Sequence, residues 1–216
     1  MRFLDRRDAG HRLAERLSSM GLEDPLVLAL PRGGVPVGYE VAVALRVPLE
    51  VFVARKIGAP GHEELGIAAI AEGLDEPVAT ALVAQLGLSA SDLEALAARE
   101  HETLRRRVSR YRAGRSLPSV EQHDVILVDD GLATGVTAEA ALRSLRQRRP
   151  RRLVLAVPVC SPDTADRLRR IADEVVCVFA PDVMFAIGTW YEDFAQTTDG
   201  EVITLLEESR ALPTGR

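Results

Sequence analysis

Short apolar runs recur along the chain, and segments with helical spacing of apolar residues alternate with them. The apolar runs lie at 26–30, 49–54, 125–128, 153–157 and 174–178. The segments with helical spacing lie at 5–20, 35–45, 89–112, 137–147 and 163–171. A strand that is apolar on both faces belongs to a parallel sheet covered by helices on both sides. The alternation therefore predicts an α/β fold built on a parallel sheet with helices on both faces.

Length and composition favour one domain over two. A chain of 216 residues with 47% hydrophobic residues can bury one substantial core, and its 27% charged residues supply a polar surface. No repeat, low-complexity tract or linker interrupts the alternation of strands and helices. We therefore expect residues 1–216 to form a single domain, with its core at about 22–180.

Charge and hydropathy exclude several kinds of partner. A net charge of −5 argues against a general nucleic-acid binder, because such proteins rely on clustered cations. No segment reaches the roughly 20 apolar residues that a membrane span needs, and the first residues contain no apolar core of signal-peptide length. Cys160 and Cys177 lack metal-ligand spacing and lie in apolar surroundings, as buried cysteines in a reducing compartment do. We expect a cytoplasmic protein that binds small molecules, with no nucleic acid and no membrane as partner.

The strongest functional signal is the segment 125–137, V-I-L-V-D-D-G-L-A-T-G-V-T. Its strand places Asp129 and Asp130 at the carboxyl end, where α/β sheets bind ligands. The Gly/Thr loop that follows opens a helix, and the N-terminal amides and dipole of a helix favour an anion. The carboxylates would repel phosphate but suit vicinal hydroxyls or a hydrated metal. Ribose 5-phosphate meets both requirements, whereas the alternative is a turn followed by an ordinary helix cap.

Two other phosphate-binding loops are excluded. A Walker A loop needs a lysine directly before its final serine or threonine, but Val136 precedes Thr137. The segment 33–38 has Val35 at the position of the second glycine of the dinucleotide-binding fingerprint.

Residues 128–137 resemble the signature of type I phosphoribosyltransferases that binds 5-phosphoribosyl-1-pyrophosphate (PRPP). The resemblance implies that Asp129 and Asp130 hold the 2′ and 3′ hydroxyls of the ribose. It also implies that the loop around the 5-phosphate consists of Gly131, Ala133, Thr134, Gly135, Val136 and Thr137. The likeness covers about residues 26–194, which is most of the chain.

Further landmarks of that family occur in the expected order. Arg32, Gly33 and Gly34 follow the first strand and resemble the loop that contacts pyrophosphate. Arg55 and Lys56 follow the second strand and resemble the basic pair found there, and Lys56 is the only lysine among 27 basic residues. The resemblance implies catalytic roles for Arg32, Lys56 and Asp130, with a surface arginine and lysine as the alternative.

The segment 58–77 contains four glycines and two prolines, which predicts a mobile segment or a short hairpin near the site. In the family this position carries a flexible lid loop. His62, Glu63 and Glu64 fall within it and could move protons, although an exposed loop explains them equally well. The arginines at 105–107 are interpreted as a solvated helix face.

The tail 185–194 resembles the segment with which hypoxanthine-guanine phosphoribosyltransferases stack the base and bind Mg²⁺. That likeness implies acceptor-binding roles for Phe185, Trp190 and Tyr191, with core packing as the alternative. It also implies that Glu192 and Asp193 join Asp129 and Asp130 as metal ligands. We expect a small hood from the N-terminal helix, from 181–210, or from both. Ala133 stands where the 6-oxopurine enzymes have an aspartate, which counts against hypoxanthine and guanine as acceptors.

These features predict a Mg²⁺-dependent phosphoribosyltransferase of nucleotide metabolism. It would move the 5-phosphoribosyl group from PRPP to a nitrogen acceptor such as a nucleobase, releasing pyrophosphate. We also expect a homo-oligomer. A regulatory PRPP or nucleotide sensor without turnover is the first alternative, and a hydrolase with Asp129 as nucleophile is a more distant one.

Overall fold

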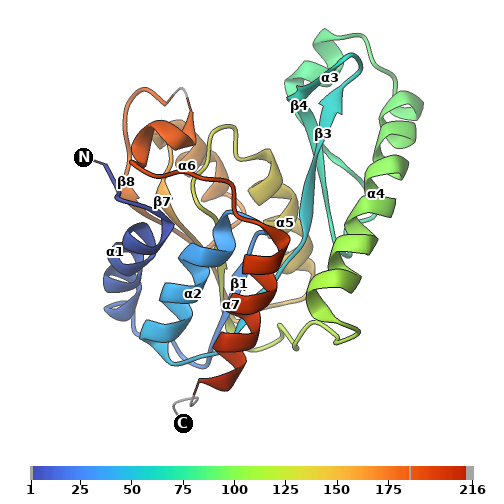
Figure 1. The fold of residues 1–216 in the computed structure, drawn as a ribbon. Coiled ribbons are helices and arrows are strands. Elements are labelled where there is room, and N and C mark those ends of the chain that lie inside the picture. The colour runs from blue at the N-terminus through green and yellow to red at the C-terminus, as the bar shows by residue number, and fades with distance from the viewer. Residues whose placement is uncertain (1, 185, 213–216) are drawn as a thin grey trace.

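The predicted parallel sheet is confirmed, and it has five strands. The computed structural model describes residues 2–184 and 186–212. From one edge to the other, the strands are β2 (Leu49–Val51), β1 (Pro25–Ala29), β6 (Asp124–Val128), β7 (Arg152–Val159) and β8 (Glu174–Phe179). Every neighbouring pair runs parallel, with Ala29 opposite Val128 at the centre (Figure 1). The carboxyl ends of these strands therefore lie along one edge of the sheet.

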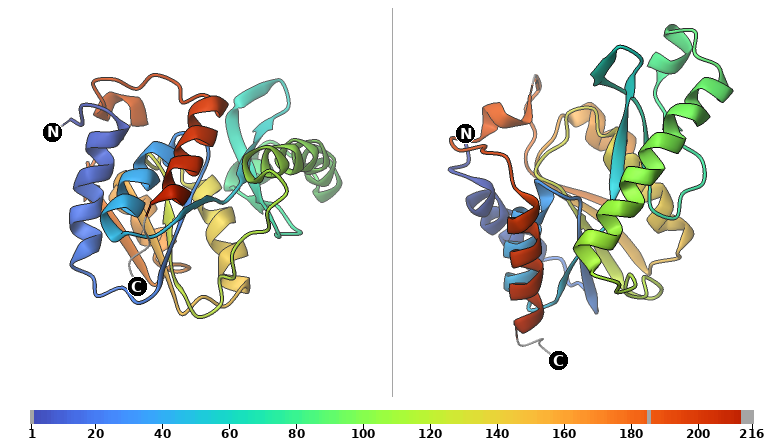
Figure 2. Two further views of the ribbon diagram at one scale, coloured as in Figure 1. Left: turned by 60° about the horizontal axis from the view of Figure 1, so that its bottom comes forward. Right: turned by 45° about the vertical axis from the view of Figure 1, so that its right-hand side comes forward.

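Helices cover both faces of this sheet (Figure 2). One face carries α1 (Arg6–Ser18), α2 (Gly34–Leu45) and α7 (Asp199–Ala211), and the other carries α5 (Val136–Gln147) and α6 (Pro162–Leu168). Alternate side chains of a strand point to opposite faces. In β1, Val27 and Ala29 pack in the first layer, whereas Leu26 and Leu28 pack in the second. Burial on both faces is the reason that the strands are continuously apolar in sequence.

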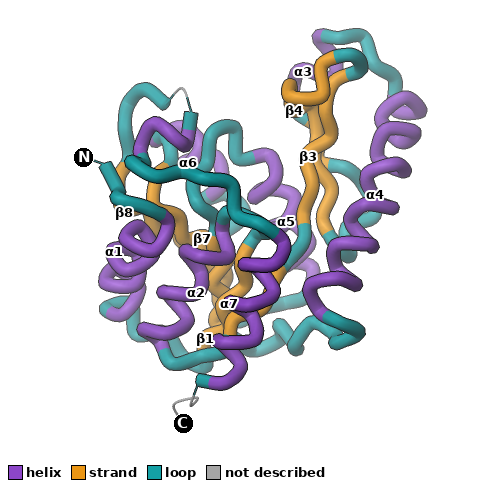
Figure 3. Tube along the Cα trace, in the orientation of Figure 1, coloured by secondary structure: helices purple, strands orange, loops and turns teal. Residues whose placement is uncertain are grey.

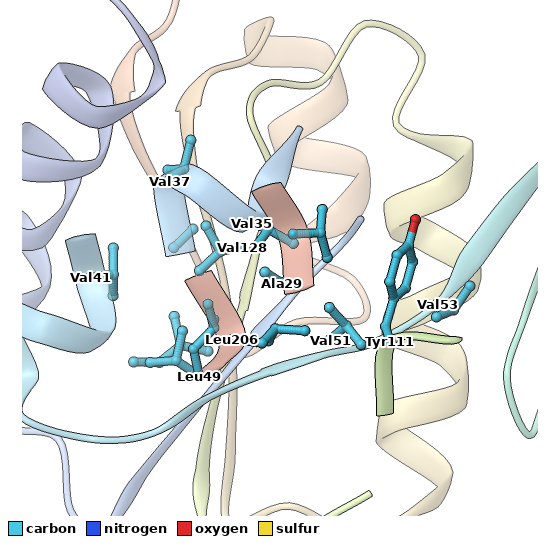
Figure 4. Close-up of a cluster of buried hydrophobic side chains, with 14 of the residues drawn as sticks. Ala29, Val35, Val37, Val41, Leu49, Val51, Val53, Tyr111, Val128 and Leu206 are labelled. Carbon is cyan, nitrogen blue, oxygen red and sulfur yellow. The ribbon is translucent and has the colours of Figure 1, made fainter. Parts of the chain in front are cut away.

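The core between the sheet and helices α1, α2 and α7 also contains a side chain from a helix that does not cover the sheet. In Figure 4, Val35 of α2 lies near Ala29, Leu206 of α7 lies near Leu49, and Tyr111 stands beside Val53. Tyr111 belongs to helix α4 (Ala90–Arg112) and is 2% exposed. A buried aromatic side chain of this kind contributes about 1.5–3 kcal/mol of transfer free energy. Tyr111 therefore anchors the end of α4 to the sheet.

A second, antiparallel sheet occupies the region between β2 and α4. It consists of β3 (Ala54–Ala59), β4 (His62–Ala71) and β5 (Val78–Ala79), and the short helix α3 (Ala81–Gln85) follows it. The predicted strand 49–54 is therefore two elements, because the chain leaves the parallel sheet after Val51. Figure 1 shows β3, β4 and α4 extending beyond the carboxyl edge of the parallel sheet. Of the two alternatives for 58–77, the structure has the hairpin.

Two of the glycines that suggested a loop in the sequence lie inside this hairpin, where the chain packs too closely for a side chain. A Cβ atom on Gly58 would lie 2.3 Å from the carbonyl oxygen of Glu63, and one on Gly66 would lie 2.7 Å from Cδ of Lys56. The register shifts on both sides of Gly58. Glycine in a strand often marks such an irregularity or a close approach. Composition alone does not distinguish this use of glycine from its use in a loop.

Helix α7 is the main element that the sequence analysis did not predict. Thr198 caps it, since its hydroxyl accepts a hydrogen bond from the amide of Glu201 and the carboxylate of Glu201 accepts one from the amide of Thr198. This reciprocal capping box has a recognisable pattern, Thr-x-x-Glu. The segment before it contains the short 3-10 helix η1 (Ile187–Trp190) and otherwise follows an irregular path (Figure 3).

Cys160 and Cys177 are free cysteines, the first buried and the second half-buried. Among residues 2–184 and 186–212, the structure contains no helix with the length and hydropathy needed to span a membrane.

Candidate functional site

The order of the strands determines where two loops meet. The chain moves from β1 through α2 to β2 on one side, and from β6 through α5 to β7 on the other. β1 and β6 are neighbours, and the chain leaves them in opposite directions along the sheet. The loops that follow these two strands therefore begin side by side at the carboxyl edge. Open α/β sheets bind their ligands at such a switch point. The first loop begins with a cis peptide bond between Pro31 and Arg32.

Gly33 and Gly34 bring the loop after β1 into direct contact with the acidic pair. A Cβ atom on Gly33 would lie 2.0 Å from Oδ2 of Asp130. A Cβ atom on Gly34 would lie 2.8 Å from the carbonyl oxygen of Val128 and 2.9 Å from Cα of Asp129. Any side chain at either position would overlap atoms of the acidic segment. The structure therefore brings together two loops that lie far apart in the sequence.

The two carboxylates lie in surroundings that disfavour their charge. Oδ1 of Asp129 accepts the backbone amide of Asp130 at 2.9 Å, and Oδ2 of Asp130 accepts Nε of Arg6 at 2.8 Å. Burial raises the pKa of Asp129 well above its ordinary value, and the carboxylate of Asp130 raises it further. Burial also raises the pKa of Asp130, although Arg6 opposes this shift. A ligand that donates hydrogen bonds or positive charge would stabilise the ionised pair.

Arg6 is a residue of this site that the sequence analysis missed. It lies in the first turn of α1, and its side chain is 12% exposed. Its Nη1 donates to the carbonyl oxygen of Ala195 at 2.7 Å, and its guanidinium lies 3.9 Å from the centre of the Phe194 ring. Arg6 thus connects the N-terminal helix and the tail to Asp130. No motif distinguishes it from the other arginines of the chain.

The predicted phosphate loop leads directly into helix α5. Ala133 and Thr134 are exposed, and Gly135 has a φ of 70° immediately before the helix begins. A Cβ atom on Gly135 would lie 2.7 Å from Cγ2 of Thr164, and Arg167 donates to the carbonyl oxygen of Thr134. Helix α6 therefore supports the back of the loop. The first amides of α5 lack partners within the helix, as at any helix N-terminus, and they provide donors for an anion.

The two predicted pyrophosphate-binding arginines approach carboxylates of α7 and α4. Arg32 has a guanidinium nitrogen 3.9 Å from a carboxylate oxygen of Asp199, at the start of α7. Nε of Arg55 donates to Glu100 of α4 at 2.5 Å, and its side chain is 20% exposed. Both guanidinium groups are half-buried and close to acidic partners.

Lys56 and the hairpin turn lie farther into solvent. The ammonium of Lys56 donates to the carbonyl oxygen of Glu64 at 2.8 Å, and its side chain is 40% exposed. His62, Glu63 and Glu64 are exposed at the start of β4. The structure therefore places these three exposed side chains on the hairpin.

The tail contacts the acidic segment through a buried tyrosine. Tyr191 is 2% exposed, and its hydroxyl donates to the backbone oxygen of Asp130 at 2.6 Å. Trp190 is half-buried, with its ring centre 5.0 Å from that of Phe179. In this structure Tyr191 is packed within the core beneath the site, which is the core-packing alternative for that residue. The predicted acceptor-binding residue Phe185 lies outside the described residues.

Glu192 and Asp193 are exposed and pair through their backbone amides with the carbonyl oxygens of Phe3 and Leu4. Within 2–184 and 186–212, no three His, Cys, Asp or Glu side chains form a group that could hold a metal ion. The structure therefore does not bring these two residues together with Asp129 and Asp130 into one acidic cluster.

Comparison with known proteins assigns the chain to a family. The family model of the phosphoribosyl transferase domain matches residues 4–193. The chain belongs to the phosphoribosyl transferase family. This assignment agrees with the resemblance in residues 128–137.

Two curated proteins and one crystal structure are similar to this chain. Two provisionally named phosphoribosyl transferases of Mycobacterium tuberculosis, from strains CDC 1551 and H37Rv, are 41% identical over 207 residues. These residues are 96% of this chain but 47% of each relative, so the chain spans about half the length of the curated relatives it matches. The crystal structure of the protein TT1426 from Thermus thermophilus is 46% identical, with a TM-score of 0.80 and full coverage of both chains.

The raised pKa values of the acidic pair lead to a pH-dependent prediction. A carboxyl whose pKa is higher in the folded than in the unfolded state lowers stability as pH rises above its unfolded value of about 4. Asp129→Asn removes one such group and retains the oxygen that accepts the Asp130 amide. We expect the variant to unfold at a higher temperature than the wild type at pH 8, with a smaller difference near pH 4. Thermal unfolding of both proteins between pH 4 and pH 8 measures this difference in unfolding temperature. A difference that does not grow with pH would contradict a raised pKa of Asp129 in the folded state.

Proposed function

We propose that the protein transfers the 5-phosphoribosyl group of PRPP to a nitrogen acceptor and releases pyrophosphate. One observation carries the proposal. The loop after β1 and the acidic loop after β6 touch at the switch point of the sheet, where Gly33 contacts the Asp130 carboxylate. The N-terminus of α5 follows the acidic loop, and Arg32 directly precedes Gly33. The three parts correspond to the three charged or polar regions of PRPP.

Each part of the site suits one region of PRPP. Asp129 and Asp130 would accept hydrogen bonds from the ribose hydroxyls, which stabilises their ionised forms. The loop from Ala133 to Thr137 would bind the 5-phosphate with backbone amides and threonine hydroxyls. The amides of Gly33 and Gly34, together with Arg32, Arg55 and Lys56, would bind the pyrophosphate.

The transfer itself needs mainly positioning and charge stabilisation. The bond between C1 of the ribose and the pyrophosphate oxygen breaks, and its electron pair leaves with pyrophosphate. The lone pair of the acceptor nitrogen forms the new bond to C1, and the proton carried by that nitrogen passes to water. Negative charge accumulates on the leaving group, where the cations at Arg32 and Lys56 would stabilise it.

We propose Mg²⁺ as the metal of this reaction, because it neutralises charge on the pyrophosphate of PRPP. Among the described residues, one oxygen of each carboxylate in the Asp129–Asp130 pair has no hydrogen-bond donor. Mg²⁺ commonly takes one or two carboxylates and completes its shell with phosphate oxygens and water. The acidic pair fits that role, with Asp129 and Asp130 as ligands.

The acceptor is proposed to be a nucleobase or a similar heterocycle. Arg6 links the Asp130 carboxylate to the tail at Ala195, and Tyr191 contacts the Asp130 backbone from the core, so the tail borders the acidic pair. An acceptor bound beside Asp130 would therefore lie next to the tail. Trp190 remains a proposed contact for a planar ring. We propose that Tyr191 acts through Asp130, whose backbone oxygen it holds. Ala133 at the loop favours an acceptor other than a 6-oxopurine.

Release of pyrophosphate from Mg²⁺ and PRPP, measured across a panel of purine and pyrimidine bases, tests the proposal. We expect release with one class of base in the wild type. Asp130→Asn should weaken PRPP binding by about 10- to 100-fold, since hydrogen bonds to a charged group are worth about 1.5–3 kcal/mol. Binding of PRPP without pyrophosphate release for any acceptor would favour the sensor, and absence of PRPP binding would overturn both functions. The predicted homo-oligomer and cytoplasmic location stay predictions.

A further inference from the structure

Helix α4 contributes arginines to a cavity beside the proposed pyrophosphate region. The cavity has a volume of about 640 Å³ and lies between β3, the hairpin turn and α4. Arg55 and Lys56 line it from β3, and Arg99 and Arg107 line it from α4. Helix α4 was predicted with a solvated arginine face at 105–107, but Arg107 is half-buried and faces this cavity.

Arg107 lacks the kind of acidic partner that Arg55 and Lys56 have. Arg55 pairs with Glu100 at 2.5 Å, and Lys56 lies 3.6 Å from a carboxylate oxygen of Glu64. In the part of the chain that the structure describes, Arg107 makes neither a hydrogen bond nor an ion pair with another side chain. A half-buried guanidinium without a partner is costly. Its position therefore suits a ligand that supplies negative charge.

The charges around Arg107 include two of the proposed pyrophosphate-binding arginines. Burial lowers the pKa of Arg107, and the positive charges of Arg55 and Arg32 lower it further, while Tyr111 and Asp199 oppose the shift. The guanidinium of Arg107 therefore lies close enough to those of Arg55 and Arg32 to be repelled by both. A polyanion placed among them would relieve that repulsion and bind all three.

The fold holds Arg107 on this side of α4. Tyr111 lies one helical turn further along the same face, and its hydroxyl donates to Asp199 at 2.5 Å. The side chain of Arg32 approaches the same Asp199 carboxylate. Arg110 completes this contact from α4, with a nitrogen 2.6 Å from Asp199. The start of α7 thus links the end of α4 to the loop after β1.

We infer that Arg107 is a further pyrophosphate-binding residue, which binds the leaving group of PRPP together with Arg32 and Arg55. This inference rests on the proposed function, since it extends the same site onto α4. A diphosphate offers several oxygens over a short span, and the planar fork of arginine matches such oxygens in pairs. Helix α4 is then part of the substrate-binding surface as well as a support for the hairpin.

Binding measurements on the full chain test the role of Arg107. Titration calorimetry in the presence of Mg²⁺ compares the wild type with Arg107→Ala, Arg107→Lys and Arg106→Ala. Arg106 is exposed on the same helix, so its replacement controls for the loss of one positive charge. The probes are inorganic pyrophosphate, PRPP and ribose 5-phosphate, the last of which lacks the pyrophosphate group.

Arg107→Ala is expected to weaken pyrophosphate and PRPP binding by about 10- to 100-fold and to leave ribose 5-phosphate binding unchanged. Arg107→Lys should recover part of the loss, because it restores the charge without the fork. Arg106→Ala should resemble the wild type. Equal pyrophosphate affinity in the wild type and Arg107→Ala, or an equal loss in Arg106→Ala, would overturn this inference alone. Failure of the wild type to bind PRPP would overturn the proposed function.

Discussion

Gly33→Ala is expected to lower PRPP affinity by at least about 100-fold while the protein remains folded. The added Cβ atom would lie 2.0 Å from Oδ2 and 2.6 Å from Cγ of Asp130. Arg6 holds the same carboxylate oxygen, and Tyr191 holds the backbone of Asp130. The carboxylate must therefore move from its place or the loop after β1 must withdraw. Either change separates the two halves of the site. Hydrogen bonds to a charged group are worth about 1.5–3 kcal/mol each, so losing two of them lowers affinity by about 100-fold or more.

Calorimetric titration measures the PRPP affinity of Gly33→Ala, and thermal unfolding measures whether this variant remains folded. Gly200→Ala is the matched control, because outside its own helix backbone and chain neighbours its Cβ atom would meet, among the described residues, only the Thr198 hydroxyl within 4 Å, at 3.8 Å. We expect Gly200→Ala to bind PRPP like the wild type. Wild-type affinity in Gly33→Ala would show that contact between the two loops is not required for binding.

Arg112→Met is expected to lower the free energy of unfolding by about 3–5 kcal/mol, since removing one partner leaves a buried charge uncompensated. Arg112 donates two hydrogen bonds to the Glu72 carboxylate, at 2.7 and 2.6 Å, and one to the carbonyl oxygen of Val51 at 2.8 Å. The side chains of Arg112 and Glu72 are 5% and 10% exposed. Glu72 also accepts the amide of Val53 at 2.8 Å, so the pair joins α4 to the chain where it leaves the parallel sheet.

Thermal and denaturant unfolding test this prediction, with a fall in Tm of about 2–4 °C for each kcal/mol lost. Arg110→Met is the control on the same helix, because the Arg110 side chain is 55% exposed in its pair with Asp199. Exposed pairs contribute about 0–1 kcal/mol. Equal losses in the two variants would contradict the argument from burial. The double change Arg112→Met with Glu72→Met should recover part of the loss, since it leaves no unpaired charge.

The sheet and its helices could be predicted because their signals are local. In 125–128 and 153–157, the apolar runs are continuous because both faces of each strand are buried in separate layers. Helix α4 was predicted from the helical spacing of its apolar residues at 89–112, and Ser89 caps it in a capping box with Asp92. Such patterns depend on neighbours within a few residues, which the sequence displays directly.

Helix α7 and the hairpin were harder to predict for different reasons. The Thr198 capping box was present in the sequence, but the helix after it has no strong apolar face to draw attention to it. In the hairpin, Gly58 and Gly66 occupy positions where a backbone or a long side chain approaches across the strands. The same residue type favours a loop when it is seen alone. Only the cross-strand neighbour distinguishes the two cases.

The sequence by itself determined the α/β class, the acidic segment and the helix that opens after it. Each depends on residues that adjoin along the chain. The tertiary structure alone decided that Arg6 pairs with Asp130, that Tyr191 is buried beneath it, and that Arg107 lies near Arg55. These contacts join residues about 50 to 124 positions apart, and the packing of α1, the tail and α4 around the sheet creates them. A charged side chain has the same identity on a solvated face and in a site, so its burial and its neighbours decide its role.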